Sequence, residues 1–250
     1  MTAGETGATG VALGDTVILS DIPGISEGLT GVLGVPAGIG PWPAVVVVHE
    51  AFGVTPEMRQ QVRRLAEAGY LALMPDLYAQ GGARRCLTAT FRSLMTGKGR
   101  AYRDIEAARQ TLLRRDDCTA AVGIIGFCMG GGFALMTATR GFDAASANYG
   151  MLPAHMETTL AGACPIIGTY GADDVMLCGA AKKLDTALDR VGVVHDVTAY
   201  PGAGHAFLND PAVMTRPVSP LMKVLGIGPN PAQAAVAWTR IDAFFALHLR

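Results

Sequence analysis

The sequence carries little charge and has no paired cysteine motif. Charged residues make up 16% of its 250 residues, and 20 Lys and Arg against 21 Asp and Glu leave a net charge of −1. Nucleic-acid-binding proteins usually have a clear positive excess, so no nucleic-acid partner is expected. The five cysteines form no C-x-x-C pair, which argues against a zinc site or a thioredoxin-like centre. A chain of this length with 50% hydrophobic residues can fold around its own core without metals or disulfides.

Signals for nucleotide cofactors, export and membrane insertion are also missing. Neither G-x-G-x-x-G nor G-x-x-x-x-G-K-[ST] occurs, so no cofactor is expected. The first residues include Glu5 and Asp15 and no positive n-region, unlike a secretory signal peptide. Residues 118–139 are free of charge and long enough to span a membrane, but a glycine triplet at 130–132 interrupts them. We interpret them as a buried strand, a tight turn and a buried helix, and we expect a cytoplasmic protein, monomeric or homodimeric, with no membrane partner.

Short apolar runs alternate with helical patterns along the chain. The β-branched run at 44–48 predicts a strand buried on both faces, and Thr55-Pro56 marks the start of a helix. Further strands are predicted at 70–74, 121–125, 166–170 and 194–200, and further helices at 102–113, 133–139, 180–191 and 238–248. This alternation predicts a single α/β domain over residues 1–250, with a mainly parallel sheet and helices on both faces. Residues 213–231 are interpreted as a long loop.

The strongest chemical signal is G-F-C-M-G at 126–130, between a predicted strand and a predicted helix. A nucleophile on a sharp strand-to-helix turn needs small neighbours, which the flanking glycines supply. Cys128 is therefore a candidate nucleophile, because the turn would project its sulfur at the carboxyl end of the sheet. The alternative is a glycine-packed junction with an inert buried thiol.

A base and an orienting acid follow in the expected order. Asp174 and His205 each come just after a predicted strand, and the order Cys128, Asp174, His205 is that of the nucleophile, acid and histidine in α/β-hydrolases. Taken alone, a glycine-histidine loop is weak evidence, and aspartates commonly cap turns. The three positions together predict a catalytic triad.

The pair His49-Glu50 also follows a predicted strand. A metalloprotease helix would need His-Glu-x-x-His, but position 53 is glycine, so no metal is expected here. Glu50 is either a loop carboxylate in solvent or a group beside the nucleophile, since this loop forms part of the oxyanion hole in such folds.

Five blocks together resemble the dienelactone hydrolase family of the α/β-hydrolase superfamily. They are H-E-A-F-G at 49–53, P-D-L-Y at 75–78, G-F-C-M-G-G at 126–131, G-A-D-D at 171–174 and G-H-A-F at 204–207. The resemblance implies that Cys128 is the nucleophile, that Asp174 and His205 complete the triad, and that Glu50 helps to activate the thiol. It also implies oxyanion donors at the backbone N–H groups of Met129 and Ala51.

The chain departs from the family pattern where a substrate carboxylate would be held. The well-known dienelactone enzymes have two arginines at positions that are Gln80 and Asn209 in this chain. Losing two charge-assisted contacts should weaken the binding of an anionic substrate. Other candidate substrate-binding residues are Phe207, beside the histidine, and three arginines that could replace the lost ones: Arg84, Arg85 and Arg216.

These observations predict a hydrolase that opens a lactone or cleaves a small carboxylic ester without a cofactor. One alternative is a thioesterase or general carboxylesterase with an apolar acyl pocket, which the loss of both arginines would favour. Another is a non-catalytic ligand-binding protein that has kept the fold.

Overall fold

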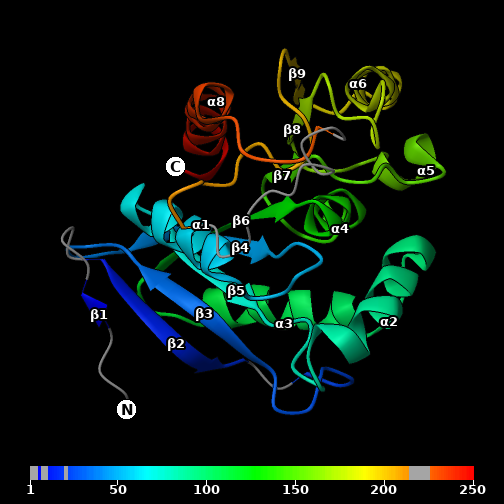
Figure 1. Cartoon of the computed structure of the whole chain (residues 1–250). Coiled ribbons are helices and arrows are strands. Elements are labelled where there is room, and N and C mark those ends of the chain that lie inside the picture. The colour runs from blue at the N-terminus through cyan, green and yellow to red at the C-terminus, as the bar shows by residue number, and fades with distance from the viewer. Residues whose placement is uncertain (1–4, 7–10, 20–21, 214–225) are drawn as a thin grey trace.

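One twisted sheet contains all the strands of the described residues, and most of its neighbouring strands run parallel. The computed structural model describes residues 5–6, 11–19, 22–213 and 226–250. The strand order is β1-β2-β3-β5-β4-β6-β7-β8-β9, with antiparallel pairing from β1 to β5 and parallel pairing from β5 to β9 (Figure 1). The strands are β1 (Glu5–Thr6), β2 (Ala12–Ile18), β3 (Thr30–Val35), β4 (Trp42–Val48), β5 (Leu71–Pro75), β6 (Cys118–Phe127), β7 (Ala145–Asn148), β8 (Ile166–Gly171) and β9 (His195–Tyr200).

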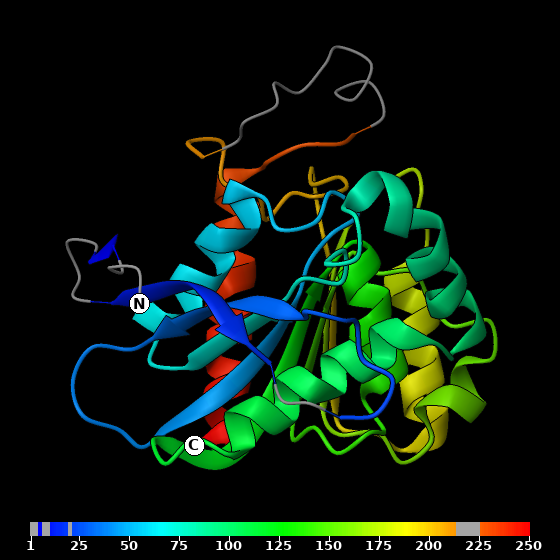
Figure 2. The ribbon, with the colours of Figure 1, turned by 90° about the horizontal axis from the view of Figure 1, so that it is seen from below.

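Helices cover both faces of this sheet. Figure 2 shows α1 (cyan) and α8 (red) on one side, with α3 and α4 (green) and α6 (yellow) on the other. The two faces form separate hydrophobic clusters. The helices are α1 (Pro56–Glu67), α2 (Ala83–Thr96), α3 (Arg100–Leu113), α4 (Met129–Thr137), α5 (Met156–Leu160), α6 (Ala180–Val191) and α8 (Pro231–Leu249). The predicted α/β fold with a mainly parallel sheet is confirmed.

The central strand β4 explains why both faces must be covered. Val45 and Val47 belong to the cluster under α1 and α8, whereas Val46 and Val48 belong to the cluster under the other helices. All four side chains are fully buried. Because side chains alternate along a strand, a continuous valine run is stable only between two layers of helices.

The central predictions from the apolar pattern are confirmed, with boundaries shifted by a few residues. Thr55 caps α1, since its hydroxyl accepts the N–H of Met58 at 3.3 Å. The pattern missed β1, β2, β3, β7, α2 and α5. In β3, glycines interrupt the apolar run, and β7 is only A-S-A-N, which lacks the large β-branched residues that signal a strand.

The charge-free stretch 118–139 forms β6 and α4, as predicted. Among the described residues, no helix combines the length and the apolar character that crossing a bilayer demands. The predicted loop at 213–231 falls mostly outside the described residues, which resume at 226, and α8 begins at Pro231. Arg216 lies outside the described residues.

A buried carboxylate ties the loop before β3 to α3. Asp104 accepts the backbone N–H of Ser26 at Oδ1 and the Ser26 hydroxyl at Oδ2, both at 2.7 Å. Both residues are buried. The Ser26 hydroxyl therefore satisfies a carboxylate oxygen that water cannot easily reach.

We expect Ser26→Ala to lower the free energy of unfolding by about 1–3 kcal/mol, because one oxygen of Asp104 is then buried without its donor. Urea unfolding would measure this change. The matched control is Ser93→Ala on α2, which removes a hydroxyl bonded only to a carbonyl of its own helix and should change stability by less than about 0.5 kcal/mol. Equal losses of unfolding free energy in both variants would contradict the stabilising role of the Ser26–Asp104 hydrogen bond.

Candidate active site

The three residues of the predicted triad lie beyond the carboxyl ends of three parallel strands, β6, β8 and β9. Cys128 directly follows β6, Asp174 lies three residues after β8, and His205 lies five residues after β9. The carboxyl ends of parallel strands share one edge of the sheet, where open α/β folds bind their ligands. This edge is the candidate active site.

The backbone at Cys128 makes a sharp turn between β6 and α4. Its φ of 54° and ψ of −113° lie in a region that residues other than glycine rarely adopt. A Cβ at Gly126 would collide with the carbonyl of Gly130, and one at Gly130 would collide with the carbonyl of Val48. Only glycine at both positions lets these backbone segments come so close. The half-buried Cys128 lies between the two glycines and is the N-cap residue of α4.

His205 and Asp174 form a buried hydrogen-bonded pair. His205 Nδ1 lies 2.7 Å from Asp174 Oδ2, and the two side chains are 9% and 0% exposed. The other oxygen of Asp174 accepts the backbone N–H groups of Met176 and Leu177 at 2.9 and 3.2 Å. These bonds fix the carboxylate, which in turn orients the imidazole ring.

The remaining nitrogen of His205 interacts with the Cys128 sulfur. Nε2 is buried and has no hydrogen-bond partner among the described residues. Burial lowers the pKa of His205, but the hydrogen bond with Asp174, the nearby Cys128 thiol and the charges of both groups outweigh it and raise the pKa to about 9. The imidazole is therefore positively charged at neutral pH.

Glu50 is the second acid of the site. Its side chain is buried, and burial raises its pKa, as does the charge of Glu57, although a hydrogen bond from Asn209 and the charge of His205 oppose the shift. The sequence left open whether Glu50 faces solvent or the nucleophile. The structure gives it His205 as an electrostatic neighbour rather than bulk water. Asn209, a candidate for substrate binding, is itself buried against Glu50.

His49 is a structural residue beneath the loop that carries Glu50. Its Nδ1 donates to the Glu50 carbonyl at 2.7 Å, and its Nε2 accepts the N–H of Leu77 at 3.2 Å. Burial lowers the pKa of His49, so the ring is neutral. With both nitrogens engaged, His49 has no lone pair left for a metal ion.

Tyr78 links the two segments that carry the predicted oxyanion donors. Its hydroxyl donates to the Ala51 carbonyl at 3.0 Å and lies 3.7 Å from Met129 Sδ. The N–H groups of Ala51 and Met129 donate to no backbone carbonyl of the described residues. Two unpaired N–H groups near a nucleophile, one of them at a helix N-terminus, can stabilise a developing oxyanion.

Comparison with known proteins identifies the family to which the chain belongs. The model of the "Dienelactone hydrolase family" matches residues 29–249. The chain belongs to the dienelactone hydrolase family. It is a hydrolase, as the names of its relatives and the structures of this family indicate.

The relatives have moderate sequence identity to this chain. The "Putative carboxymethylenebutenolidase" of Methylorubrum extorquens is 33% identical over 195 residues, which cover 70% of this chain and 66% of that protein. The "Carboxymethylenebutenolidase" of Rhodococcus opacus is 28% identical, covering 82% of this chain and 81% of its own. A crystal structure described as "Putative Dienelactone Hydrolase from Klebsiella pneumoniae" has 27% identity and a TM-score of 0.75, covering 94% of this chain and 98% of its own.

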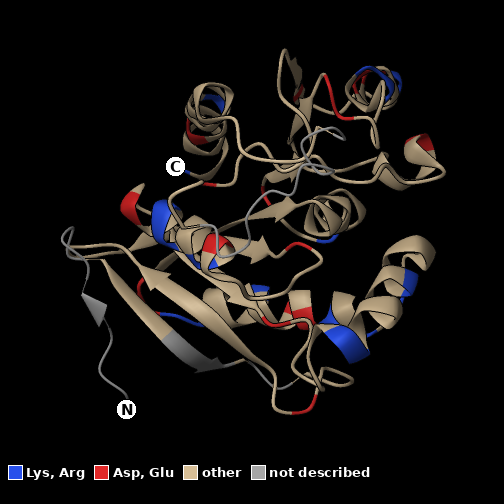
Figure 3. Ribbon diagram, in the orientation of Figure 1, with Lys and Arg blue, Asp and Glu red and all other residues tan. Residues whose placement is uncertain are grey.

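The candidate substrate-binding residues lie in different environments. Gln80 accepts a hydrogen bond from Arg100 of α3, and both line a surface hollow together with Arg85 and Glu27. Figure 3 shows basic residues on α2 and where α3 begins. Arg84 is exposed and does not line this hollow. Arg100 was not singled out from the sequence, because its distance from Gln80 along the chain hides their contact.

Phe207 is fully buried, with its ring centroid 5.9 Å from that of Tyr149 and 5.3 Å from that of Tyr200. It therefore packs within the core below the site. Tyr149, which directly follows β7, was missed because β7 was missed. Its ring centroid lies 5.2 Å from that of His205, its φ is 40°, and its buried hydroxyl has no hydrogen-bond partner among the described residues. Tyr149 thus forms one wall of the histidine site.

We expect the His205 ring to titrate near pH 9 in the native protein, above the usual value of about 6.5. Asp174→Asn and Cys128→Ala should each lower this midpoint, because each removes a group that stabilises the imidazolium. The charged form stabilises the fold fully below about pH 6.5, and this contribution is lost as the pH rises through about 9. Ring NMR signals followed against pH would measure the midpoint. A native midpoint near 6.5, or no change in either variant, would contradict this result.

Proposed function

We propose that this protein hydrolyses a lactone or a small carboxylic ester through a covalent thioester on Cys128. In this proposal His205 carries the proton, Asp174 orients His205, and Glu50 helps to activate the thiol. The observation that carries the proposal is the buried Asp174–His205 pair, whose free nitrogen has the Cys128 sulfur as its electrostatic partner. This arrangement is that of a nucleophile, a base and an orienting acid.

The reaction proceeds in two halves. The Cys128 thiolate attacks the acyl carbon, and the carbonyl electrons move to the oxygen, which the N–H groups of Met129 and Ala51 stabilise. The intermediate collapses, the bond from the acyl carbon to the alkoxy oxygen breaks, and His205 gives its proton to that oxygen. Water then loses a proton to His205 as it attacks the thioester, the carbon–sulfur bond breaks, and the acid leaves. With a lactone, the alcohol remains part of the released molecule.

Two features support the use of a thiol here. The raised pKa of His205 keeps a positive charge on the imidazole at neutral pH, so the ring already holds the proton that the leaving alkoxy oxygen needs. Cys128 also caps α4, so the unpaired N–H groups at the start of that helix face the same region. The thioesterase alternative is not favoured, since relatives carry the name of carboxymethylenebutenolidase.

Replacement of Cys128 tests the covalent step. Cys128→Ala should lower kcat by about 10⁴-fold or more, because no thioester can form. Cys128→Ser should also lose most of the activity, since an alkoxide is far harder to form than a thiolate. Release of p-nitrophenol from small esters would measure the rate, and mass spectrometry after a rapid quench should find the acyl group on Cys128.

Cys178→Ser is the matched control, because Cys178 is an exposed free thiol. It should keep the native rate. Native-level turnover in Cys128→Ala would refute the mechanism, and loss of activity in Cys178→Ser would show that thiol replacement harms the enzyme for another reason.

Tyr78→Phe tests the oxyanion site. Losing the hydroxyl that holds Ala51 should lower kcat by about 10-fold and leave KM nearly unchanged, since oxyanion donors act mainly in the transition state. Tyr102→Phe is the control, because the buried Tyr102 hydroxyl has no hydrogen-bond partner among the described residues. A fall in the melting temperature with unchanged kcat in Tyr78→Phe would assign Tyr78 to stability alone.

A further inference from the structure

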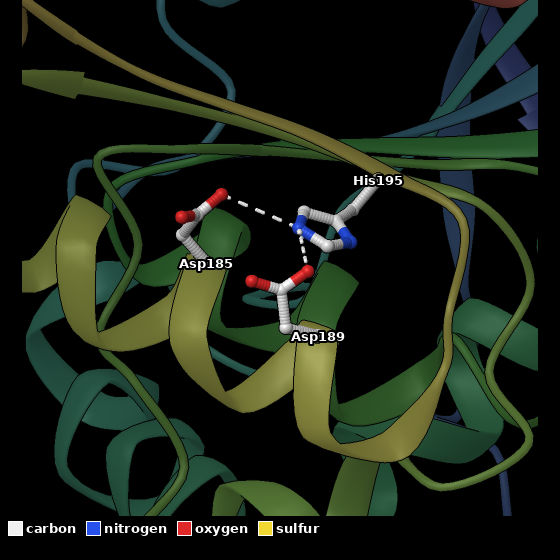
Figure 4. Close-up of side chains that lie close together, drawn as sticks. All are labelled: Asp185, Asp189 and His195. Carbon is white, nitrogen blue, oxygen red and sulfur yellow. Dashed lines mark ion pairs between the residues drawn. The ribbon is translucent and has the colours of Figure 1, made fainter.

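Three side chains with metal-ligating atoms meet at the amino end of β9. Asp185 and Asp189 are four residues apart on α6, and His195 is the first residue of β9 (Figure 4). Residues four apart on a helix lie on the same face, so both carboxylates point toward the histidine ring. Their ligand atoms all lie within 4.8 Å of one another.

The hydrogen bond at the other ring nitrogen fixes how His195 faces the carboxylates. Nδ1 lies 2.7 Å from the Val193 carbonyl oxygen, which can only accept, so Nδ1 carries a hydrogen. Nε2 faces Asp185 Oδ1 at 3.3 Å and Asp189 Oδ1 at 3.8 Å. A histidine that ligates a metal ion typically donates its second N–H to a carbonyl or carboxylate in this way.

A cation between these three atoms would stabilise their arrangement. A lone pair and two carboxylate oxygens repel one another unless a positive charge separates them. Among the described residues, no Lys or Arg forms an ion pair with Asp185 or Asp189, and the neighbouring Arg190 pairs with Glu157 at 2.7 Å. A proton on Nε2 could bond Asp185, but at 3.8 Å it would leave Asp189 without a hydrogen bond.

We infer that Asp185, Asp189 and His195 form a binding site for a divalent transition-metal ion such as Zn²⁺. Ligands of a tetrahedral zinc ion at about 2.0–2.1 Å lie about 3.3 Å apart, and the two distances from Nε2 are 3.3 and 3.8 Å. One imidazole and two carboxylates suit zinc, cobalt or nickel better than Mg²⁺ or Ca²⁺, which prefer oxygen ligands alone. Water would complete the coordination, because Asp185 and Asp189 are 47% and 73% exposed.

The site lies at the opposite end of β9 from the loop that carries His205. Six residues of extended strand, His195 to Tyr200, span about 17 Å. The ion would join α6 to β9, the last strand at this edge of the sheet. Its expected effect is therefore on the stability of this edge rather than on the chemistry at Cys128.

Calorimetric titration of the metal-free protein with ZnCl₂ and CoCl₂ tests the inference. We expect one ion to bind at this cluster and, with the ion at about a hundredfold above its Kd, the melting temperature to rise by about 5 °C. Asp189→Asn and His195→Gln should abolish that binding event. Asp189 is largely exposed, so Asp189→Asn should fold normally. His155→Gln is the matched control, because His155 is exposed and outside the cluster, and it should bind as the native protein does.

The visible spectrum of the cobalt complex separates this site from the free thiols. Oxygen and nitrogen ligands give only weak bands, whereas thiolate ligands add an intense sulfur-to-cobalt charge-transfer band. Binding that persists in both cluster variants, or that carries the thiolate band, would assign the ion to cysteines and overturn the inference. No heat and no melting shift at millimolar ion would also overturn it.

Discussion

The approach of backbone atoms around Cys128 is the constraint on which the candidate site depends. Gly126 and Gly130 leave no room for a Cβ, because carbonyl groups of α4 and β4 occupy that space. Gly131 packs in the same way against Gly150, beyond β7. Three parallel strands, β4, β6 and β7, thereby end close together around one turn, and Tyr149 after β7 lies near the Cys128 thiol. Backbone contact, rather than side-chain packing, sets these positions.

The second constraint on the site is that its ionisable side chains are buried. Neighbouring groups compensate Asp174, His205 and Glu50 to different degrees for the loss of hydration. Asp174 has no exposed side-chain surface, yet it accepts two backbone N–H groups and faces His205. His205 gains more from Asp174 and Cys128 than it loses by leaving water, and its pKa rises. At Glu50, the hydrogen bond from Asn209 and the charge of His205 do not outweigh burial and the charge of Glu57, so its pKa rises as well. The histidine is thus biased toward its charged form and the glutamate toward its neutral form.

Local patterns in the sequence predicted most of the parallel strands, and they placed the candidate triad residues just after three of these strands. The valine run of β4, the Thr55 cap of α1 and the glycines at 126 and 130 each act through neighbouring residues in the chain, so the sequence alone displays them. β7 was missed because its four small residues owe their strand conformation to the neighbours β6 and β8. Tyr149 was missed for the same reason, since it follows β7. The contact of Gln80 with Arg100 was also missed, because it depends on how α3 packs. The metal-ligating cluster also escaped notice, because its residues belong to no known motif and meet only after α6 turns back into β9.

The two departures from the family pattern have different structural outcomes. At Gln80 a guanidinium is present after all, since Arg100 reaches it from α3 and Arg85 lines the same hollow. At Asn209 no cation replaces the arginine among the described residues, and the amide is turned to Glu50. Without a cation there, little opposes the effect of burial on Glu50, and its pKa is raised. The shift moves Glu50 toward its neutral form, so Asp174, which accepts the hydrogen bond of His205, becomes the main partner for the charge on that ring.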